Sequence, residues 1–139
     1  VAPSGEGAVR CMKEALKGTN QKVDYINAHG TSTPVGDMQE LNAVREVFKD
    51  SSYLPKLTST KSLTGHSLGA TGVQEAIYTL IMMNNKFISG SSNIDNEDPE
   101  IGSIEIPRKT IKDIEINLAL SNSFGFGGTN ACLAFSKFN

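Results

Sequence analysis

The chain has 139 residues, of which 38% are hydrophobic and 20% charged, and this composition is typical of a globular domain with its own core. The net charge of −2 excludes the basic surface that nucleic acid requires, and no apolar run reaches the ~20 residues that span a bilayer. Cys11 and Cys132 lack the spacing of a disulfide framework or a metal site, so we expect a reduced, cytoplasmic protein.

Helix and strand patterns alternate along the chain and end in a pair of strands. In chain order we expect a helix at 4–17, a strand at 23–28, a helix from Asp37 to Phe48, a strand at 57–60, a helix at 69–84, an extended segment at 87–92, a short strand at 104–106, and strands at 116–121 and 131–138. The helix at 69–84 is apolar over more than one face, which indicates that it is covered. The order predicts one α/β domain with a mixed sheet and helices on both faces.

Two polar segments follow predicted strands and contain both histidines of the chain. His29 follows the strand at 23–28, and Lys61 and His66 follow the strand at 57–60. The carboxyl ends of parallel strands are where α/β sheets bind ligands, so these residues are expected to form one site. At a helix N-terminus His66 is expected to stay neutral and to donate a hydrogen bond to a carbonyl oxygen. The alternative is that each histidine only ties its loop to backbone.

Lys61 needs a carboxylate partner if it is buried, because an unpaired ammonium in a core is costly. Glu40 is one candidate and Asp37 the other, and a solvated surface lysine is the alternative. The glycine-rich segment 124–128 allows close approach of backbone to a ligand, and a free amide there could stabilise an oxyanion. A hairpin turn with a bulge explains that segment equally well.

The segment Gly65-His66-Ser67-Leu68-Gly69 fits the nucleophile elbow of serine hydrolases of the α/β class, and a strand-to-helix context agrees with it. Those enzymes place the acid and then the histidine after the serine. No histidine follows His66 in this chain, so the triad cannot be closed within it. A serine hydrolase is therefore the weaker alternative, and Ser67 is expected to cap the helix that follows.

Three segments together resemble the C-terminal half of β-ketoacyl-[acyl-carrier-protein] synthases. They are Asn27-Ala28-His29-Gly30-Thr31-Ser32-Thr33-Pro34-Val35-Gly36-Asp37, Thr60-Lys61 with Gly65-His66-Ser67-Leu68-Gly69-Ala70, and Ser121-Asn122-Ser123-Phe124-Gly125-Phe126-Gly127-Gly128-Thr129-Asn130. Their order and spacing match along nearly the whole chain, and residues 1–16 and 72–78 are most similar to type I synthases, with type II close behind. The resemblance implies a thiolase-like fold of two similar halves, with residues 1–139 as the C-terminal one.

The resemblance also implies the decarboxylative condensation of fatty acid elongation. A cysteine takes the acyl chain from acyl carrier protein (ACP), malonyl-ACP loses carbon dioxide, and the resulting carbanion attacks the acyl thioester. By their motifs, His29 and His66 are the catalytic histidines that hydrogen-bond the malonyl thioester carbonyl. Lys61 organises the site electrostatically, paired with Glu40.

Further roles follow from the same resemblance. Thr31 and Thr33 would contact the pantetheine arm, the Phe126 amide would form part of the oxyanion hole, and the Phe126 ring beside Phe124 would gate the acyl pocket. No cofactor is required. A structural monovalent cation, known in some members, would lie near Asn27, Glu75, Ser121 and Asn122. The partners implied are acyl- and malonyl-ACP and a second copy in a homodimer, with no nucleic acid and no membrane.

The nucleophilic cysteine of the family belongs to the N-terminal half, which this sequence lacks. Cys11 and Cys132 follow no nucleophile motif and are expected in the core, so the segment alone is predicted to be inactive. In the family a strand precedes the opening helix, and we expect its place to be in the middle of the sheet. Its absence would leave a gap through which the segment associates. A non-catalytic subunit like a chain-length factor remains a further alternative, although it need not retain His29, Lys61 and His66.

Overall fold

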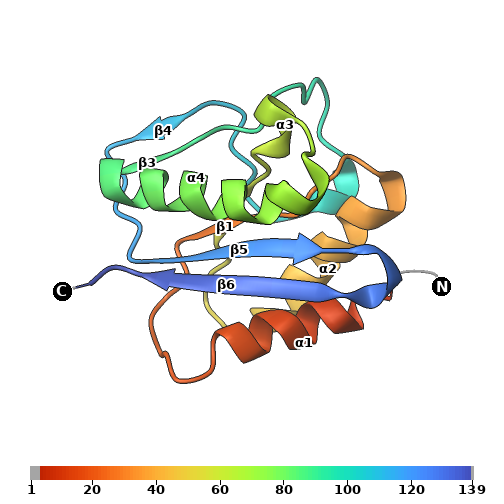
Figure 1. Ribbon diagram of the computed structural model, residues 1–139, viewed down its shortest axis with the longest axis horizontal. Helices are drawn as coiled ribbons and strands as arrows, with labels where there is room; N and C mark the ends of the chain where they lie inside the picture. Colours follow the sequence, from red (N-terminus) through yellow and green to blue (C-terminus); the bar gives the residue numbers. More distant parts are fainter. Residues whose placement is uncertain (1–3, 139) are drawn as a thin grey trace.

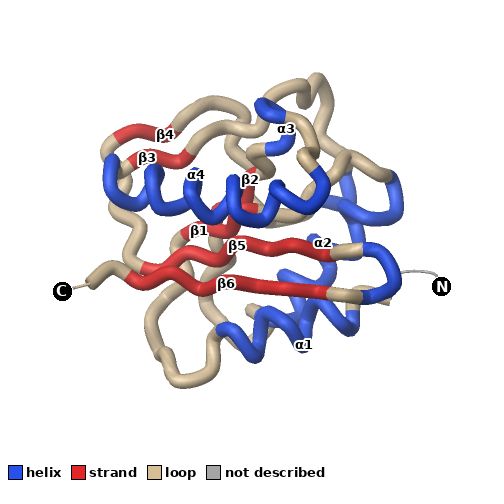
Figure 2. The backbone as a smooth tube through the Cα atoms, in the orientation of Figure 1, coloured by secondary structure: helices blue, strands red, loops and turns tan. Residues whose placement is uncertain are grey.

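The computed structural model describes residues 4–138, and a four-stranded sheet lies at its centre (Figure 1). Its strand order is β2 (Lys56–Thr58), β1 (Tyr25–Asn27), β5 (Leu118–Phe124), β6 (Asn130–Ser136). The first three strands are parallel, and β6 runs antiparallel to β5. Helices α1 (Glu6–Ala15) and α2 (Pro34–Val47) cover one face and α4 (Thr71–Asn85) the other (Figure 2). The predicted mixed sheet with helices on both faces is confirmed.

Alternation along the strands separates two cores. Ile26 and Leu120 point to the side of α1 and α2 and pack with buried residues of both helices. Tyr25 and Ala119, their neighbours in sequence, point to the other side and pack with Met82 of α4. Because β1 and β5 are covered on both faces, most residues in them are buried, including the polar Asn27, Ser121 and Asn122 near their carboxyl ends.

Helix α2 begins three residues before the predicted start. Pro34 occupies the first turn, where its missing amide costs no hydrogen bond, and Thr33 is the N-cap residue. Asp37 is therefore inside the first turn and is not the cap, which corrects the prediction. Its Oδ1 instead accepts a hydrogen bond from the Ser32 backbone N at 3.1 Å and closes the turn before the helix.

The segment between β2 and α4 contains more structure than the sequence indicated. A short helix α3 (Lys61–Thr64) follows β2 and ends at Gly65, whose φ of 76° lies in the region that favours glycine. A 3₁₀ turn η1 (Leu68–Ala70) then leads into α4, which begins at Thr71 and not at Gly69. Lys61 consequently lies in a helix, one short turn beyond the strand end.

The predicted strand at 104–106 is wrong, because these residues have no regular secondary structure. The Glu105 carbonyl oxygen nevertheless accepts a hydrogen bond from Leu57 N at 3.1 Å, so the segment follows the edge of the sheet. A second, two-stranded sheet pairs β3 (Phe87–Ile88) with β4 (Ile111–Lys112). The intervening acidic loop contains a 3₁₀ turn, η2 (Pro99–Ile101), and a third, η3 (Phe126–Gly128), joins β5 to β6.

The expected gap in the middle of the sheet is absent. Strand β1 pairs directly with β5, with Ile26 opposite Leu120, so the sheet is continuous from β2 to β6. The prediction that the segment associates with another chain through such a gap is therefore wrong. The physical reason is that the family's preceding strand has no place between β1 and β5, whose backbones already bond to each other.

Helix α4 buries polar residues as well as Met82 and Met83, and it exposes several apolar residues on its outer side. Its buried residues include Thr71, Glu75 and Thr79, which recur every four positions and face the sheet. Val73 and Ile77 on the opposite side are 66% and 49% exposed. The prediction that this helix is covered on more than one face is therefore wrong within the chain described. No helix among residues 4–138 has the length and apolar content needed to cross a membrane.

Candidate active site

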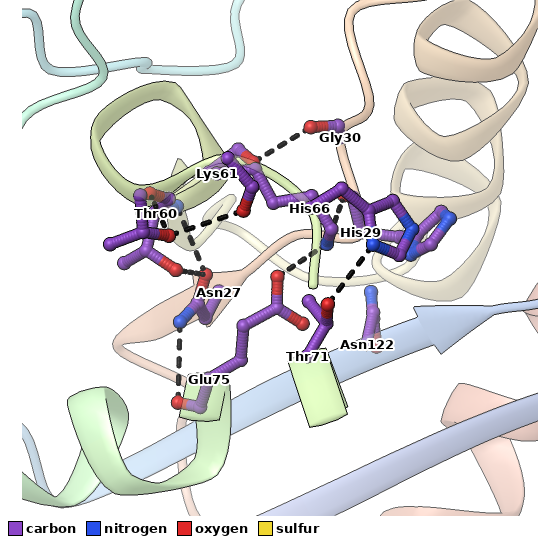
Figure 3. Close-up of polar contacts among 12 residues, drawn as sticks. Asn27, His29, Gly30, Thr60, Lys61, His66, Thr71, Glu75 and Asn122 are labelled. Atoms are coloured by element: carbon purple, nitrogen blue, oxygen red, sulfur yellow. Dashed lines mark hydrogen bonds and ion pairs between the residues drawn. The ribbon is translucent and has the colours of Figure 1, made fainter. Parts of the chain in front are cut away.

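The two histidines meet at the carboxyl end of the sheet (Figure 3). His29 follows β1 and His66 follows α3. Their ring centroids lie 5.7 Å apart and the ring planes are nearly perpendicular, at 86°. The Phe124 ring at the end of β5 lies 6.1 Å from the ring of His29. The structure thus brings together residues that are 37 positions apart, as their places after parallel strands predicted.

The hydrogen bonds of His66 determine its tautomer. The Leu68 backbone N donates to His66 Nδ1 at 3.0 Å, and the Thr71 hydroxyl lies 3.0 Å from the same nitrogen. A nitrogen that accepts from an amide carries no proton, so in this arrangement the ring is neutral and its N–H is at Nε2. The sequence predicted a neutral donor here from the α4 helix dipole. The actual cause is local, because α4 begins only at Thr71.

His29 is kept neutral by its surroundings. Burial, the positive charge of Lys61 and the proximity of His66 together lower the pKa of His29 from 6.5 to about 4, with burial the largest cause. Its Nδ1 is buried and has no hydrogen-bond partner among the residues described. At neutral pH the His29 ring is therefore uncharged and can donate one N–H, and the bonds at His66 Nδ1 leave the N–H of that ring at Nε2.

Lys61 pairs with Glu75, and not with the predicted Glu40. The Lys61 Nζ contacts Glu75 Oε1, and the two side chains are only 5% and 2% exposed. Nζ also donates to the His29 carbonyl oxygen at 2.6 Å. Burial raises the pKa of Glu75 although the lysine acts to lower it. Asp37, the other candidate partner, bonds Ser32 instead. Glu75 lies on the buried side of α4, and this position places it next to Lys61.

Glu40 holds the backbone of the His29 turn. Its Oε1 accepts from His29 N and its Oε2 from Gly30 N, both at 2.9 Å. Asn122 Nδ2 on β5 donates to the same Oε1 at 3.1 Å. Burial raises the pKa of Glu40, and these three donors act to lower it, as does the charge of Lys61. Glu40 is therefore a positioning residue, and its interaction with Lys61 is only a longer-range one.

The four residues assigned to a cation lie on adjoining elements. Asn27 and Ser121 are opposite each other in β1 and β5, and Asn27 Oδ1 already accepts from Thr60 N and Oγ1 at 3.4 and 3.3 Å. Glu75 Oε2 and Asn122 Oδ1 are buried oxygens with no partner in the described part of the chain. Two oxygens of the predicted set are therefore buried and without a partner, whereas the Asn27 amide is already engaged. No cluster of three or more acidic, histidine or cysteine ligands occurs within residues 4–138.

Of the predicted substrate-contact residues, only Phe124 lies against a histidine ring, that of His29. Thr31 and Thr33 lie on the turn before α2, with their hydroxyls 3.3 Å apart and accessible. Phe126 lies in η3 and is fully exposed, whereas Phe124 is half-buried beside His29. Their assigned roles at a pantetheine arm and an acyl pocket stay predictions.

Ser67 does not have the setting of a hydrolase nucleophile. The helix α3 separates it from β2, so the sharp strand-to-helix turn of that motif is absent. Nδ1 of the adjacent His66 is engaged by Leu68 and Thr71. Ser67 is the N-cap residue of η1, but its side chain makes no capping bond, and the N-cap residue of α4 is Ala70.

Sequence reasoning missed Thr71 as the partner of His66, Glu75 as the partner of Lys61, and Glu40 as the acceptor of the His29 turn. One signal was available for Glu75, since a single carboxylate within an otherwise apolar helix needs a buried partner. The sequence contains no such signal for Thr71 and Glu40, because their bonds depend on the conformations of the loops that contain His66 and His29.

Comparisons with known proteins agree on the family. Residues 1–95 match the model described as "Beta-ketoacyl synthase, C-terminal domain". The 3-oxoacyl-[acyl-carrier-protein] synthase 1 of Escherichia coli (strain K12) is 57% identical over 137 residues, which are 99% of this chain and 33% of that protein. The chain thus spans about a third of the length of such relatives.

Solved structures give the same answer for the fold. The ishigamide ketosynthase/chain length factor superposes with a TM-score of 0.91 at 30% identity, over 99% of this chain and 34% of that one. A type II PKS acyl-carrier protein in complex with its ketosynthase, AntDE:AntF, gives 0.89 at 29%, with coverage of 99% and 34%. The predicted thiolase-like fold is confirmed. The chain belongs to the β-ketoacyl synthase family and corresponds to its C-terminal domain.

Proposed function

We propose that the chain is the C-terminal part of a 3-oxoacyl-[acyl-carrier-protein] synthase of type I that condenses acyl groups with malonyl-ACP. The observation that carries the proposal is the pair of neutral imidazoles, His29 and His66, 5.7 Å apart at the carboxyl end of the sheet. The 57% identity to the Escherichia coli synthase 1 supports the substrate class and the type.

The two histidines would act on the malonyl thioester. When the bond to the carboxylate breaks, carbon dioxide leaves and the electron pair moves onto the adjacent carbon, so negative charge develops on the thioester oxygen. Neutral N–H donors at His29 and His66 stabilise that charge without giving up a proton, and the bonds at His66 Nδ1 and at the His29 backbone hold them near it. The carbanion then attacks the acyl thioester, and the thiol that carried the acyl group leaves.

Lys61 adds to the effect of burial in keeping His29 uncharged. Its ammonium group lies behind the His29 turn, bonded to the His29 carbonyl oxygen and to Glu75. A positive charge there lowers the pKa of His29 and so keeps the ring an uncharged donor. Glu40 contributes orientation, since its carboxylate fixes the two amides of the same turn. Thr31, Thr33 and the Phe126 amide complete the proposed site as contacts to pantetheine and to the oxyanion.

The nucleophile would come from another part of the synthase. Burial raises the pKa of the Cys132 thiol to about 12 and also raises that of Cys11, so neither is a thiolate at neutral pH. We therefore expect no condensation by residues 1–139 alone when they are assayed with acyl-ACP and malonyl-ACP. Turnover within about tenfold of the complete synthase would contradict this part of the proposal.

The central test is the decarboxylation of malonyl-ACP by the complete synthase. His29→Ala and His66→Ala should each lower kcat by about 10²- to 10³-fold, because each removes one donor from the developing charge. Lys17→Ala, which changes an exposed lysine on the other side of the sheet, is the matched control and should leave kcat unchanged. Rates within threefold of wild type for both histidine variants would refute the proposed roles.

The same variants separate the competing functions. A serine hydrolase would lose activity on Ser67→Ala and would label with a fluorophosphonate, whereas a synthase would do neither. A subunit like a chain-length factor, the second component of the ishigamide complex, would tolerate both histidine changes. The two engaged histidines and the buried Lys61 support the catalytic interpretation.

A structural monovalent cation is proposed for the buried oxygens Glu75 Oε2 and Asn122 Oδ1. When bound it would supply positive charge that offsets their desolvation, and it is not required for the reaction. A Tm that rises when choline is replaced by sodium or potassium at equal ionic strength, and no longer does so in Asn122→Ala, would support it. Equal Tm values in all three salts would contradict it.

The partners proposed are acyl carrier protein and a second copy of the synthase, in the cytoplasm. Among the similar structures is an acyl-carrier protein in complex with its ketosynthase, which supports the first partner by analogy. The exposed apolar side of α4, with Val73 and Ile77, would be covered by the rest of the synthase. Sedimentation of the complete protein, alone and with malonyl-ACP, tests both associations.

A further inference from the structure

The backbone of His29 and Gly30 is held by side chains on all four of its polar groups. The two amides donate to Glu40, and the His29 carbonyl oxygen accepts from Lys61. The remaining group, the Gly30 carbonyl oxygen, accepts from Ser59 Oγ at 2.7 Å. Ser59 follows β2 and has no part in the mechanism proposed above, yet it completes the set of bonds around the catalytic turn.

Contact between Ser59 and Gly30 is close as well as polar. Gly30 has a φ of 28°, and a Cβ added to it would lie only 2.8 Å from Ser59 Cβ. Only glycine allows the turn to approach the serine in this way. The turn is thus packed against Ser59 on one side and bonded to Glu40 on the other, which leaves its backbone little freedom.

Ser59 is in turn fixed by the segment 91–93. Its backbone N donates to Ser91 Oγ at 3.0 Å. Ser91 is only 5% exposed and is anchored by its own N–H to the Pro107 carbonyl oxygen at 2.8 Å. The Ser91 hydroxyl thus links the loop after β3 to Ser59, which lies between the end of β2 and Lys61.

A second serine makes the same connection on the other side of Lys61. Ser62 Oγ donates to the Ser59 carbonyl oxygen at 2.8 Å and accepts from Ser92 N at 2.9 Å. Asn93 Nδ2 reaches the Ser62 carbonyl oxygen at 3.4 Å. The start of α3, and with it Lys61, is therefore attached to segment 91–93 at both flanking serines.

We propose that Ser59 and Ser62 are positioning residues for the condensation, and that they couple segment 91–93 to the His29–Gly30 turn and to Lys61. The proposal rests on the function proposed above for His29. Ser59 acts directly on the turn through the Gly30 carbonyl oxygen, and Ser62 acts through Ser59. Ser59 is therefore the more important of the two.

These bonds act on the orientation of the Gly30 carbonyl group and of the adjacent His29 ring. Without the Ser59 hydroxyl the Gly30 carbonyl oxygen has to turn toward solvent, and the adjacent His29 ring loses part of its fixed orientation. A catalytic donor that moves by a fraction of an ångström stabilises the developing charge less well. Ground-state binding of malonyl-ACP, in which the His29 bond is one contact among several, should change less than the rate.

The test uses the complete synthase and two readouts on the same protein. In Ser59→Ala, kcat for malonyl-ACP decarboxylation should fall by about three- to tenfold while KM stays within about twofold. Ser62→Ala should give a smaller fall of about twofold. In nitrogen-15 NMR titrations the His29 imidazole should titrate at higher pH in Ser59→Ala, because a looser turn leaves the ring less desolvated.

Ser51→Ala is the matched control, since Ser51 is an exposed serine in the turn after α2. It should keep both the wild-type kcat and the wild-type His29 titration. A Ser59→Ala variant with wild-type kcat and wild-type titration would overturn the proposal. So would a lower Tm with both readouts unchanged, because Ser59 would then serve stability alone.

The two proposals can fail separately. If the unmodified synthase does not decarboxylate malonyl-ACP, the proposed function is wrong, and the NMR titration alone decides whether Ser59 positions His29. If the synthase is active and His29→Ala abolishes the activity while Ser59→Ala changes neither readout, the function stands and the positioning role falls.

Discussion

The two faces of the sheet each bury an apolar cluster, but they differ in how the helices above them place their polar residues. Between the sheet and α1 and α2, apolar residues such as Met12 and Leu120 are fully buried. Between the sheet and α4, Glu75 and Thr79 are buried and Val73 is exposed. Apolar burial stabilises a fold by roughly 25 cal/mol per Å², whereas buried polar groups cost free energy unless they are paired. The α4 side combines an apolar cluster around Met82 with the buried Lys61–Glu75 ion pair, and Glu40 holds the His29 turn from the other side.

The largest expected effect comes from the α4 side. Glu75→Ala leaves the Lys61 ammonium buried without its partner, since Lys61 is only 5% exposed. We expect the free energy of unfolding to fall by about 3–5 kcal/mol, measured by urea denaturation of the chain. The matched control is Glu46→Ala, which removes the partner of Lys49 in an exposed ion pair and should be close to neutral.

A second variant sharpens this test. Lys61→Met combined with Glu75→Gln removes both charges, and it should recover most of the stability lost in Glu75→Ala. Equal losses in the single and the double variant would show that α4 tolerates an unpaired charge. The contrast between the two faces would then not depend on pairing.

In the core under α1 and α2, a substitution should lower the free energy of unfolding somewhat less, and through a lost apolar contact. Leu120→Ala removes a fully buried side chain from the core under α1 and α2 and should cost about 3 kcal/mol. The titration of His29 should change little, because Leu120 packs under α1 and α2, whereas Lys61, which lowers the pKa of His29, pairs with Glu75 of α4. Leu133→Ala on β6, where the leucine is 51% exposed, is the control and should cost much less. A large change in the His29 titration would contradict the separation of the two faces.

The pH dependence of the free energy of unfolding, through His29, is expected to be an effect of intermediate size. The pKa of His29 is about 4 when folded and about 6.5 when unfolded. Between these values the unfolded chain binds the extra proton, so the free energy of unfolding falls as the pH is lowered from 6.5 to 4. With allowance for solvent screening, the loss is roughly 1–2 kcal/mol. His29→Gln should remove this part of the slope in urea titrations at pH 7, 6 and 5, and an unchanged slope would contradict it.

Sequence reasoning worked best where one periodic pattern determines the structure. The strand at 23–28, the α/β order and the meeting of His29 with His66 followed from apolar patterns and from the rule for parallel strand ends. It failed where a tertiary contact overrides a local pattern. Pro34 began α2 before Asp37 could cap it, and residues 104–106 follow the sheet edge without becoming a strand.

The error over the partner of Lys61 has a specific cause. Glu40 and Glu75 are both buried carboxylates near the same lysine, and composition does not say which one forms the ion pair. The choice is made by the α3 turn, which carries Lys61 beyond the end of β2 and toward α4. The His29 and Gly30 amides, left without strand partners, take Glu40 instead.

The smallest expected effect on the chain alone is on the outer side of α4. Val73→Ser changes a side chain that is 66% exposed, and the two residues have similar helix propensity, so the free energy of unfolding should change by at most about 0.5 kcal/mol. In the complete synthase the same change should cost about 1.5–3 kcal/mol if the rest of the protein covers this side. Met82→Ser, on the inner side of the same helix and 1% exposed, should be costly in both. A small effect of Val73→Ser in both proteins would mean that the apolar side of α4 stays in water.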